Sequence, residues 1–334
     1  MIQVSSPVFS GNEVAYVTAC VQSGIVSSHS DFVKKFEGIF ADKFGMSAVS
    51  CTSGTAALHL ALLAAGVGPG DEVILPDLTF AATINAVLHV GAKPVLVDVD
   101  ANWNIDPHKV DMAITPATRA MVSVDLYGQP CQIGALKEIR LRHGIVLIED
   151  RAESMIERET IEGDYGCFSF YANKHITSGE GGMVLCHNAE RVRLFRSHGM
   201  TKPYEHEVAG LNYRMTGLQA ALGVAQMERL DEMSERRRET IRRYQMNGLE
   251  GRGNWLFVIT IADPVTMADT LKSHGIETRP VFKPLHLQAP YKQHGAFPNA
   301  MKAWKTGLCL PTGPHLSNEQ IDYISATVLE AIHV

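Results

Sequence analysis

Apolar residues in the first 190 positions follow two different spacings. Phe32, Val33, Phe36, Ile39, Phe40 and Phe44 recur at helical spacing, so residues 30–44 are predicted to form an amphipathic helix. Other apolar residues form short, near-continuous runs, which are typical of strands covered on both faces. These runs lie at 72–76, 93–98, 120–125, 145–149, 167–171 and 182–186, and helices are predicted from Ser53 onward and over 81–90 and 133–143. The alternation predicts an α/β fold with a mainly parallel sheet flanked by helices.

The last third of the chain has a different pattern. Thr216 and Gln219 have the spacing of a capping box, and the apolar residues that follow predict a long helix from Thr216. The glycine-rich segment 248–253 interrupts this helical pattern. Beyond it, strands at 255–261 and 277–282 and helices at 264–273 and 317–332 are predicted. We therefore expect a large domain over 1–246 and a smaller C-terminal α+β domain over 247–334.

Composition narrows the class of protein. The chain has 334 residues, 46% of them apolar, and its 30 Lys and Arg against 36 Asp and Glu give a net charge of −6. Such a chain is globular, and the mild negative charge argues against nucleic acid or an anionic membrane as a partner. The N-terminus has no signal-peptide pattern, and the six scattered cysteines include no CxxC pair, so we expect a cytoplasmic protein without a metal site.

Four polar features stand where the chain leaves predicted strands or enters predicted helices. Ser53-Gly54-Thr55 opens a helix and could hold a phosphate, although it could also be a plain N-cap. Asp150 ends a strand, where open sheets bind ligands or where a carboxylate caps the next segment. Lys174 follows a strand and is either a nucleophilic amine or a surface lysine. The fourth feature, Gly210–Arg214, precedes the long helix and by itself is only a polar loop.

The first three features together match the needs of pyridoxal phosphate (PLP). Its phosphate needs a helix N-terminus with hydroxyl donors, its ring nitrogen needs a carboxylate, and its aldehyde needs a lysine. No GxGxxG follows the first strand, which weakens a dinucleotide-binding hypothesis, and the GxSxG motif of hydrolases is absent.

The sequence also resembles a known family over nearly its whole length. The stretches that carry the resemblance are Ser53-Gly-Thr-Ala-Ala-Leu-His-Leu-Ala-Leu, Gly68-Pro-Gly-Asp-Glu-Val-Ile, Leu126-Tyr-Gly-Gln-Pro, Ile148-Glu-Asp-Arg-Ala-Glu, Phe168-Ser-Phe-Tyr-Ala-Asn-Lys, Thr177-Ser-Gly-Glu-Gly-Gly-Met and Asn212-Tyr-Arg-Met-Thr-Gly-Leu-Gln-Ala-Ala. They are similar to the PLP-dependent sugar aminotransferases of the DegT family, which implies the aspartate-aminotransferase-like fold, PLP fold type I.

The resemblance implies roles for individual residues. Lys174 matches the lysine that forms the Schiff base with PLP, and Asp150 matches the carboxylate that pairs with the ring nitrogen. The other matched cofactor positions are Glu153 near the phenolic oxygen, Phe80 stacked on the ring, and Gly54, Thr55 and Ser169 at the phosphate. Asn212 matches a residue that reaches the phosphate from the neighbouring subunit, which implies a homodimer with shared active sites.

The resemblance also implies a reaction. Some relatives are dehydratases with histidine in place of the lysine, so Lys174 favours transamination, with L-glutamate as the donor and a keto nucleotide sugar as the acceptor. Residues 275–280 and 284–291 are similar to perosamine-type enzymes, which act on C4 of 4-keto-6-deoxy sugars. The candidate substrate residues are His175, Arg279, His286 and Tyr291. A C3 sugar or keto-inositol aminotransferase remains an alternative, as does a non-catalytic regulatory protein.

Two segments, 154–164 and 248–253, are shorter than is usual in this family. Both lie near the parts that shape the substrate site in relatives, so we expect this chain to differ from them there.

Overall fold

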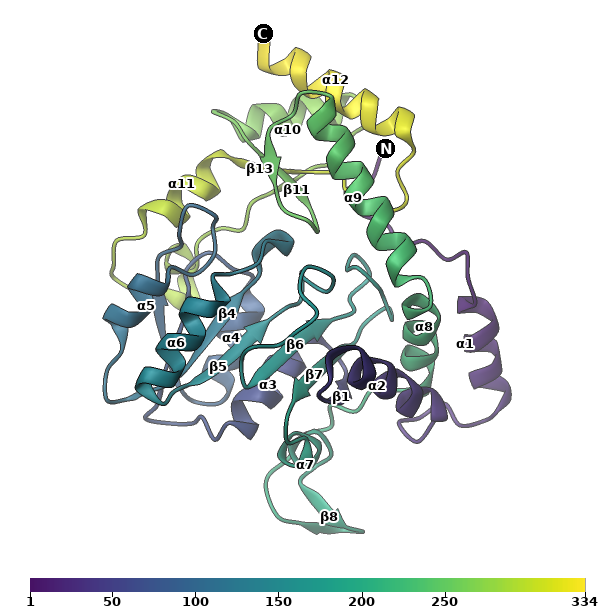
Figure 1. Ribbon diagram of the computed structural model, residues 1–334, viewed down its shortest axis with the longest axis vertical. Coiled ribbons are helices and arrows are strands. Elements are labelled where there is room, and N and C mark those ends of the chain that lie inside the picture. Colours follow the sequence, from purple (N-terminus) through teal and green to yellow (C-terminus); the bar gives the residue numbers. More distant parts are fainter. Residues whose placement is uncertain (334) are drawn as a thin grey trace.

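A computed structural model describes residues 1–333 of the chain. A seven-stranded sheet forms the centre of its large unit (Figure 1). The strand order is β1-β7-β6-β5-β4-β2-β3. The pairs from β6 to β3 are parallel, and only β7 runs antiparallel to its neighbours β1 and β6. Helices cover both faces, which confirms the predicted α/β class.

The helices and strands have the following bounds. The helices are α1 (Glu13–Gln22), α2 (Asp31–Phe44), α3 (Gly54–Ala64), α4 (Ala81–His89), α5 (Pro107–Ala113), α6 (Ile133–His143), α7 (Glu190–Arg196), α8 (Gly217–Met227), α9 (Leu230–Met246), α10 (Pro264–Ser273), α11 (Pro298–Thr306) and α12 (Asn318–His333), with 3-10 turns η1 (Leu126–Gly128), η2 (Leu285–Leu287) and η3 (Ala289–Tyr291). The strands are β1 (Ser47–Cys51), β2 (Glu72–Pro76), β3 (Lys93–Val97), β4 (Thr118–Val124), β5 (Val146–Asp150), β6 (Tyr165–Ser169), β7 (Gly182–Cys186), β8 (Met200–Lys202), β9 (Glu205–His206), β10 (Gly251–Arg252), β11 (Phe257–Thr260), β12 (Arg279–Pro280) and β13 (Gly307–Leu310).

Local signals explain where several helices begin. The Ser30 hydroxyl accepts a hydrogen bond from the amide of Phe32 at the start of α2, and the Ser53 hydroxyl accepts one from the amide of Ala56 in α3. Such caps satisfy amides that have no partner within the helix. Phe36, Phe40 and Phe44 of α2 are buried as the helical spacing predicts, and Phe32 is half-buried, so the helix predicted over 30–44 is confirmed.

Two helices, rather than one, follow Thr216. The predicted capping box is present at α8, but the helix ends at Met227, and α9 begins at Leu230. Glu228, at the break, accepts hydrogen bonds from the side chains of Asn12 and Tyr16 near α1. The sequence has no glycine or proline at this break, so apolar spacing alone could not place it.

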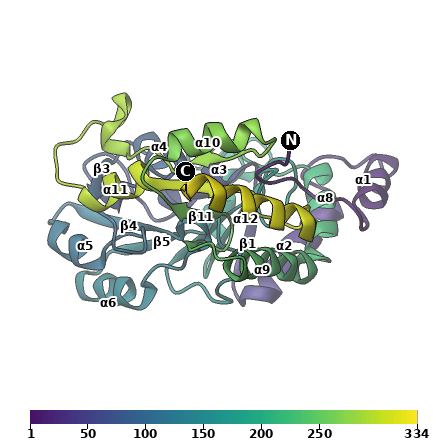
Figure 2. The same cartoon turned by 90° about the horizontal axis from the view of Figure 1, so that it is seen from above.

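A second, smaller unit sits above the sheet (Figures 1 and 2). Its antiparallel sheet has the order β10-β11-β13-β12, and α10 and α12 pack beside it. Helix α9 leads into this unit, and Tyr244 of α9 belongs to its core. The N-terminus also contacts it, because Ile2 bridges Ile276 and the carbonyl of Val4 accepts a hydrogen bond from the amide of Thr312. The domain boundary near residue 247 stays a prediction.

Two features are absent from residues 1–333. Within that range, no helix combines the length and apolar character needed to cross a membrane. The same residues contain no group of three or more His, Cys, Asp or Glu side chains arranged to hold a metal ion.

Candidate active site

A cavity of about 440 Å³ lies at the carboxyl edge of the large sheet, between the sheet and the small unit. Strands β4, β5 and β6 end at it, and α3 and α4 begin at it. It is lined by Ser53, Gly54, Thr55, Leu58, Thr79, Phe80, Ala82, Val124, Leu126, Asp150, Ala152, Glu153, Ser169, Tyr171, Asn173, Lys174, Glu180, Trp255, Arg279 and Phe282. Parallel strands in open sheets place ligand sites at this edge.

Lys174 is held between a carboxylate and an aromatic face. Its Nζ lies 3.5 Å from Oε1 of Glu153 and 4.0 Å from the ring centroid of Trp255. The Trp255 indole donates a hydrogen bond of 2.9 Å to the carbonyl of Asn173, so it is fixed beside the lysine backbone. An ammonium over an indole face is attracted by the ring quadrupole, and this contact orients the amine within the cavity.

Asp150, at the end of β5, is buried on the same wall. It accepts a hydrogen bond of 2.9 Å from the hydroxyl of Thr83 and one of 3.1 Å from the amide of Ala152. Burial raises the pKa of Asp150, although these hydrogen bonds and the charge of Lys174 oppose the rise. A buried carboxylate of this kind is suited to pair with a cationic group brought by a ligand.

Glu153 is also buried, and it has two partners. Its Oε2 accepts a hydrogen bond of 2.7 Å from the amide of Tyr127, and its other oxygen faces Lys174. Burial raises the pKa of Glu153, and the nearby charge of Lys174 opposes that rise. The carboxylate is therefore fixed by the backbone next to the amine.

The start of α3 and the end of β6 meet closely. A Cβ added to Gly54 would lie only 2.7 Å from the Cβ of Ser169, so this approach requires glycine. The first amides of a helix have no partner within the helix, and α3 points its first turn at the cavity. Gly54, Thr55 and Ser169 thus form a small cradle with the donors that bind a phosphate.

Aromatic and cationic side chains form the opposite side of the cavity. Phe80, the residue before α4, is 58% exposed, and its ring centroid lies 5.6 Å from that of Phe282. Arg279, in β12 of the small unit, also lines the cavity and is half-buried. The small unit therefore contributes to the lining of the cavity, and a substrate contact of Arg279 stays a prediction.

Four of the sequence-derived site residues do not line the cavity. Asn212 is exposed, and its backbone forms an isolated antiparallel β-bridge with Ser197. The other three contact residues outside the cavity. His175 is buried, with its Nε2 3.5 Å from Oε1 of Glu157. The Nδ1 of His286 lies 2.6 Å from Oδ2 of Asp77, and the Tyr291 hydroxyl donates a hydrogen bond of 2.6 Å to Oδ1 of Asn85. Within this chain, only Arg279 of the four candidate substrate residues reaches the cavity.

Sequence reasoning missed Trp255, Thr83 and Asn173. Trp255 stands at the start of an apolar run, where nothing local distinguishes it from a core residue. Thr83 lies one helical turn after Phe80, a spacing that could have suggested a shared face. Asn173 precedes Lys174, and its buried Oδ1 has no hydrogen-bond partner among the described residues.

The short segment 154–164 packs against charged side chains behind the cavity. Arg151 donates to the carbonyls of Ser154, Arg158 and Thr160, which holds the segment in place. The guanidinium of Arg158 pairs at 2.8 Å with the buried carboxylate of Asp125. The segment is therefore fixed by these contacts and is not a free loop.

The residues of the cavity fit PLP. The cradle at Gly54 and Ser169 suits its phosphate, buried Asp150 suits a protonated ring nitrogen, and Lys174 suits its aldehyde. The unpartnered Oδ1 of Asn173 provides a further acceptor beside the site.

Comparisons with known proteins agree with this fit. The model of the DegT/DnrJ/EryC1/StrS aminotransferase family matches residues 8–329. The GDP-perosamine synthase of Caulobacter vibrioides is 39% identical over 361 aligned positions, which cover 98% of this chain and 97% of the relative. That alignment is longer than the 334-residue chain, so the relative has segments that this chain lacks.

Two solved structures show the same architecture. The aminotransferase TlmJ from Streptoalloteichus hindustanus has a TM-score of 0.94 and 31% identity, covering 100% of this chain and 99% of TlmJ. The PLP form of Spr1654 from Streptococcus pneumoniae has a TM-score of 0.93 and 26% identity, covering 99% and 98% of the two chains. The chain therefore belongs to the DegT/DnrJ/EryC1/StrS aminotransferase family and is a PLP-dependent aminotransferase.

Proposed function

We propose that this enzyme transfers the amino group of L-glutamate to C4 of a 4-keto-6-deoxy nucleotide sugar. The observation that carries the proposal is the position of the Lys174 amine, which lies between Glu153 and Trp255 at the sheet edge where Asp150 ends its strand. The similarity to the GDP-perosamine synthase of Caulobacter vibrioides supports a nucleotide sugar and favours C4 over C3 or a keto-inositol.

Each cavity residue has a distinct task in this proposal. Lys174 would hold the aldehyde carbon of PLP, and its free amine would take a proton from the α-carbon of the donor and deliver it to C4′ of the cofactor. Asp150 holds a proton on the ring nitrogen. When bound, PLP supplies an electron-withdrawing ring that lowers the cost of removing the α-proton. Glu153 and Trp255 would orient the Lys174 amine within the cavity.

The proposal includes a homodimer with shared active sites. Asn212 lies outside the cavity of its own chain, which is compatible with Asn212 of the partner subunit completing the phosphate site. Phe80 and Tyr171, at the mouth of the cavity, are 58% and 47% exposed, and such apolar surface is suited to burial by another chain. The β8–β9 hairpin also extends from the body (Figure 1), with Tyr204 93% exposed.

We also propose that the enzyme acts in the cytoplasm. All six cysteines are free and buried, as is common in proteins of a reducing compartment.

Product analysis tests the proposed function. The PLP-loaded protein would be incubated with isotopically labelled L-glutamate and a panel of keto sugars carrying GDP, dTDP or UDP, together with 3-keto sugars and keto-inositols. We expect labelled nitrogen at C4 of a 4-keto-6-deoxy sugar, assigned by mass and NMR. Labelled nitrogen at C3 or on an inositol would contradict the proposed position, and no transfer to any of these acceptors would contradict the proposed acceptor class.

A further inference from the structure

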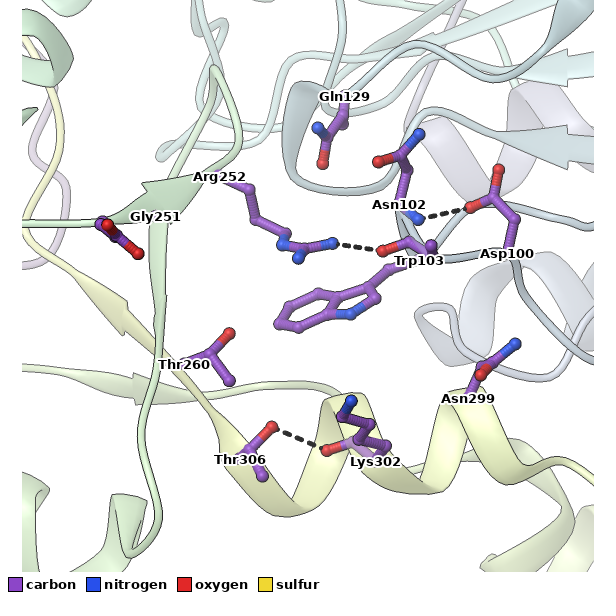
Figure 3. A pocket seen from close by; sticks show the side chains of 12 residues that line it. Asp100, Asn102, Trp103, Gln129, Gly251, Arg252, Thr260, Asn299, Lys302 and Thr306 are labelled. Atoms are coloured by element: carbon purple, nitrogen blue, oxygen red, sulfur yellow. Dashed lines mark hydrogen bonds between the residues drawn. The ribbon is translucent and has the colours of Figure 1, made fainter.

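A second cavity, of about 630 Å³, lies between the large and small units (Figure 3). It shares no lining residue with the cavity around Lys174. The large unit contributes residues 100–103 after β3 and Gln129 after η1, and the small unit contributes β10, the end of β11 and part of α11. Small-molecule sites are common at such junctions, and this volume is within their usual range.

Trp103 and Arg252 form the centre of this second cavity. The guanidinium of Arg252 lies 4.4 Å from the ring centroid of Trp103 and donates a hydrogen bond of 2.7 Å to the carbonyl of Ala101. Trp103 has a φ of 70°, a backbone conformation that is rare for a bulky residue and that persists only where its surroundings hold it. The stacked pair therefore gives the cavity a preformed cationic wall.

Several donors in this cavity have no partner. Trp103 is 7% exposed, and its indole N–H makes no hydrogen bond among the described residues; it does not belong to their buried polar atoms, so it is open to solvent. In Figure 3 the indole nitrogen lies on the ring edge toward Lys302 of α11. Lys302 forms no ion pair within residues 1–333, and Arg252 has guanidinium N–H groups beyond the one bonded to Ala101.

The two acidic residues of the cavity, Asp100 and Glu250, form no ion pair with Arg252 or Lys302 among residues 1–333. Asp100 already accepts hydrogen bonds from the amides of Asn102 and Asn104 and from the side chain of Gln132. Glu250 also lines this cavity and is exposed. The cavity thus combines three donors, from Arg252, Lys302 and Trp103, with further exposed polar groups. These are the amide of Asn102, the hydroxyl of Thr260 and the carboxylate of Glu250.

We propose that this second cavity binds a small polyhydroxylated anion of the sugar-phosphate class. The anionic group would accept hydrogen bonds from Arg252, Lys302 and the indole N–H of Trp103. The sugar hydroxyls would pair with the amide, hydroxyl and carboxylate groups on the remaining wall. The volume exceeds that needed by an inorganic ion, and the ligand would contact both units of the fold.

Calorimetric titration of the PLP-loaded protein with glucose 1-phosphate tests this site, because bound PLP occupies its own phosphate cradle. We expect saturable binding that Lys302→Gln and Trp103→Phe each weaken about tenfold, the effect of losing one hydrogen bond to a charged group. Lys305→Gln removes the same charge from α11 outside the cavity and should leave the affinity unchanged. The indole N–H signal of Trp103, assigned with Trp103→Phe, should shift on titration.

Other outcomes would overturn the proposal. These are the absence of saturable binding, an affinity that Lys302→Gln does not change, or binding that is lost in Arg279→Gln instead, which would place the ligand in the active site. Equal affinity for inorganic phosphate would overturn the sugar-phosphate assignment. Lys302 is exposed, so Lys302→Gln keeps the test valid even where Trp103→Phe fails to fold. The readout is binding, so it does not depend on the substrate proposed above.

Discussion

Replacing Gly54 with alanine should weaken PLP binding. The added Cβ would lie 2.7 Å from the Cβ of Ser169, closer than two carbon atoms can approach without movement. The Cβ of Ser169 is fixed to its own backbone, so the contact is relieved only if the backbone at the start of α3 or the end of β6 moves. Such a movement displaces the first amides of α3 from the phosphate cradle, so the cost appears as weaker phosphate binding.

The size of the effect follows from the cost of overpacking. An extra methyl group in a closely packed site costs about 1–3 kcal/mol, which corresponds to a dissociation constant about 5- to 150-fold larger. Ser169→Gly would remove the clashing atoms and leave only the Cα, at 3.4 Å, an ordinary contact. Gly54→Ala should therefore have little further effect when it is made in a Ser169→Gly background.

A double-mutant cycle on PLP affinity measures this coupling. The apo forms of wild type, both single variants and the double variant would be titrated with PLP and followed by the absorbance of the lysine-bound cofactor. Gly134→Ala is the matched control, because a Cβ added there near the start of α6 meets no atom within 4 Å. Wild-type affinity in Gly54→Ala, or an equal loss with and without Ser169→Gly, would refute this placement of the phosphate.

Three further predictions concern stability. Burial raises the pKa of Asp150, so the apo protein should lose stability as the pH rises through the pKa of this carboxyl in the folded state. Asp150→Asn should therefore unfold at a higher temperature than wild type near neutral pH. Below about pH 4 the two proteins should unfold at the same temperature. An equal gain at all pH values would contradict this. Glu157→Ala removes the buried carboxylate beside His175, an imidazole whose own pKa is lowered by burial. It should cost about 1 kcal/mol in urea unfolding, and an unchanged midpoint would show that this contact adds no stability. Thr216→Ala removes the capping box of α8 and should cost about 1 kcal/mol, and unchanged stability would show that the cap is not needed.

The sequence predicts the parts of the fold and site that depend on local pattern. Apolar runs mark the buried strands, and residues that follow those runs, such as Asp150, must meet at one sheet edge because the strands are parallel. Strand β1 lacked such a run because two of its five residues are serines. Ser50 is nevertheless buried, since its amide and hydroxyl both donate to Glu37 of α2.

The parts that could not be predicted depend on contacts between distant segments. Trp255 reaches Lys174 because its amide and that of Asn254 both donate to the carbonyl of Tyr127 in the large unit. Likewise, similarity of the 284–291 stretch to perosamine-type enzymes gives no sign that His286 pairs with Asp77 or Tyr291 with Asn85. Spacing along the chain contains no information on such pairs.

Reduction of the PLP-loaded protein with borohydride, followed by peptide mapping, identifies the lysine that holds the cofactor. We predict that the pyridoxyl group is found on Lys174 alone, and that Lys174→Ala retains no covalently bound cofactor while still unfolding cooperatively. Attachment to another lysine, or an unchanged yield of labelled protein in Lys174→Ala, would contradict the assignment of the active site.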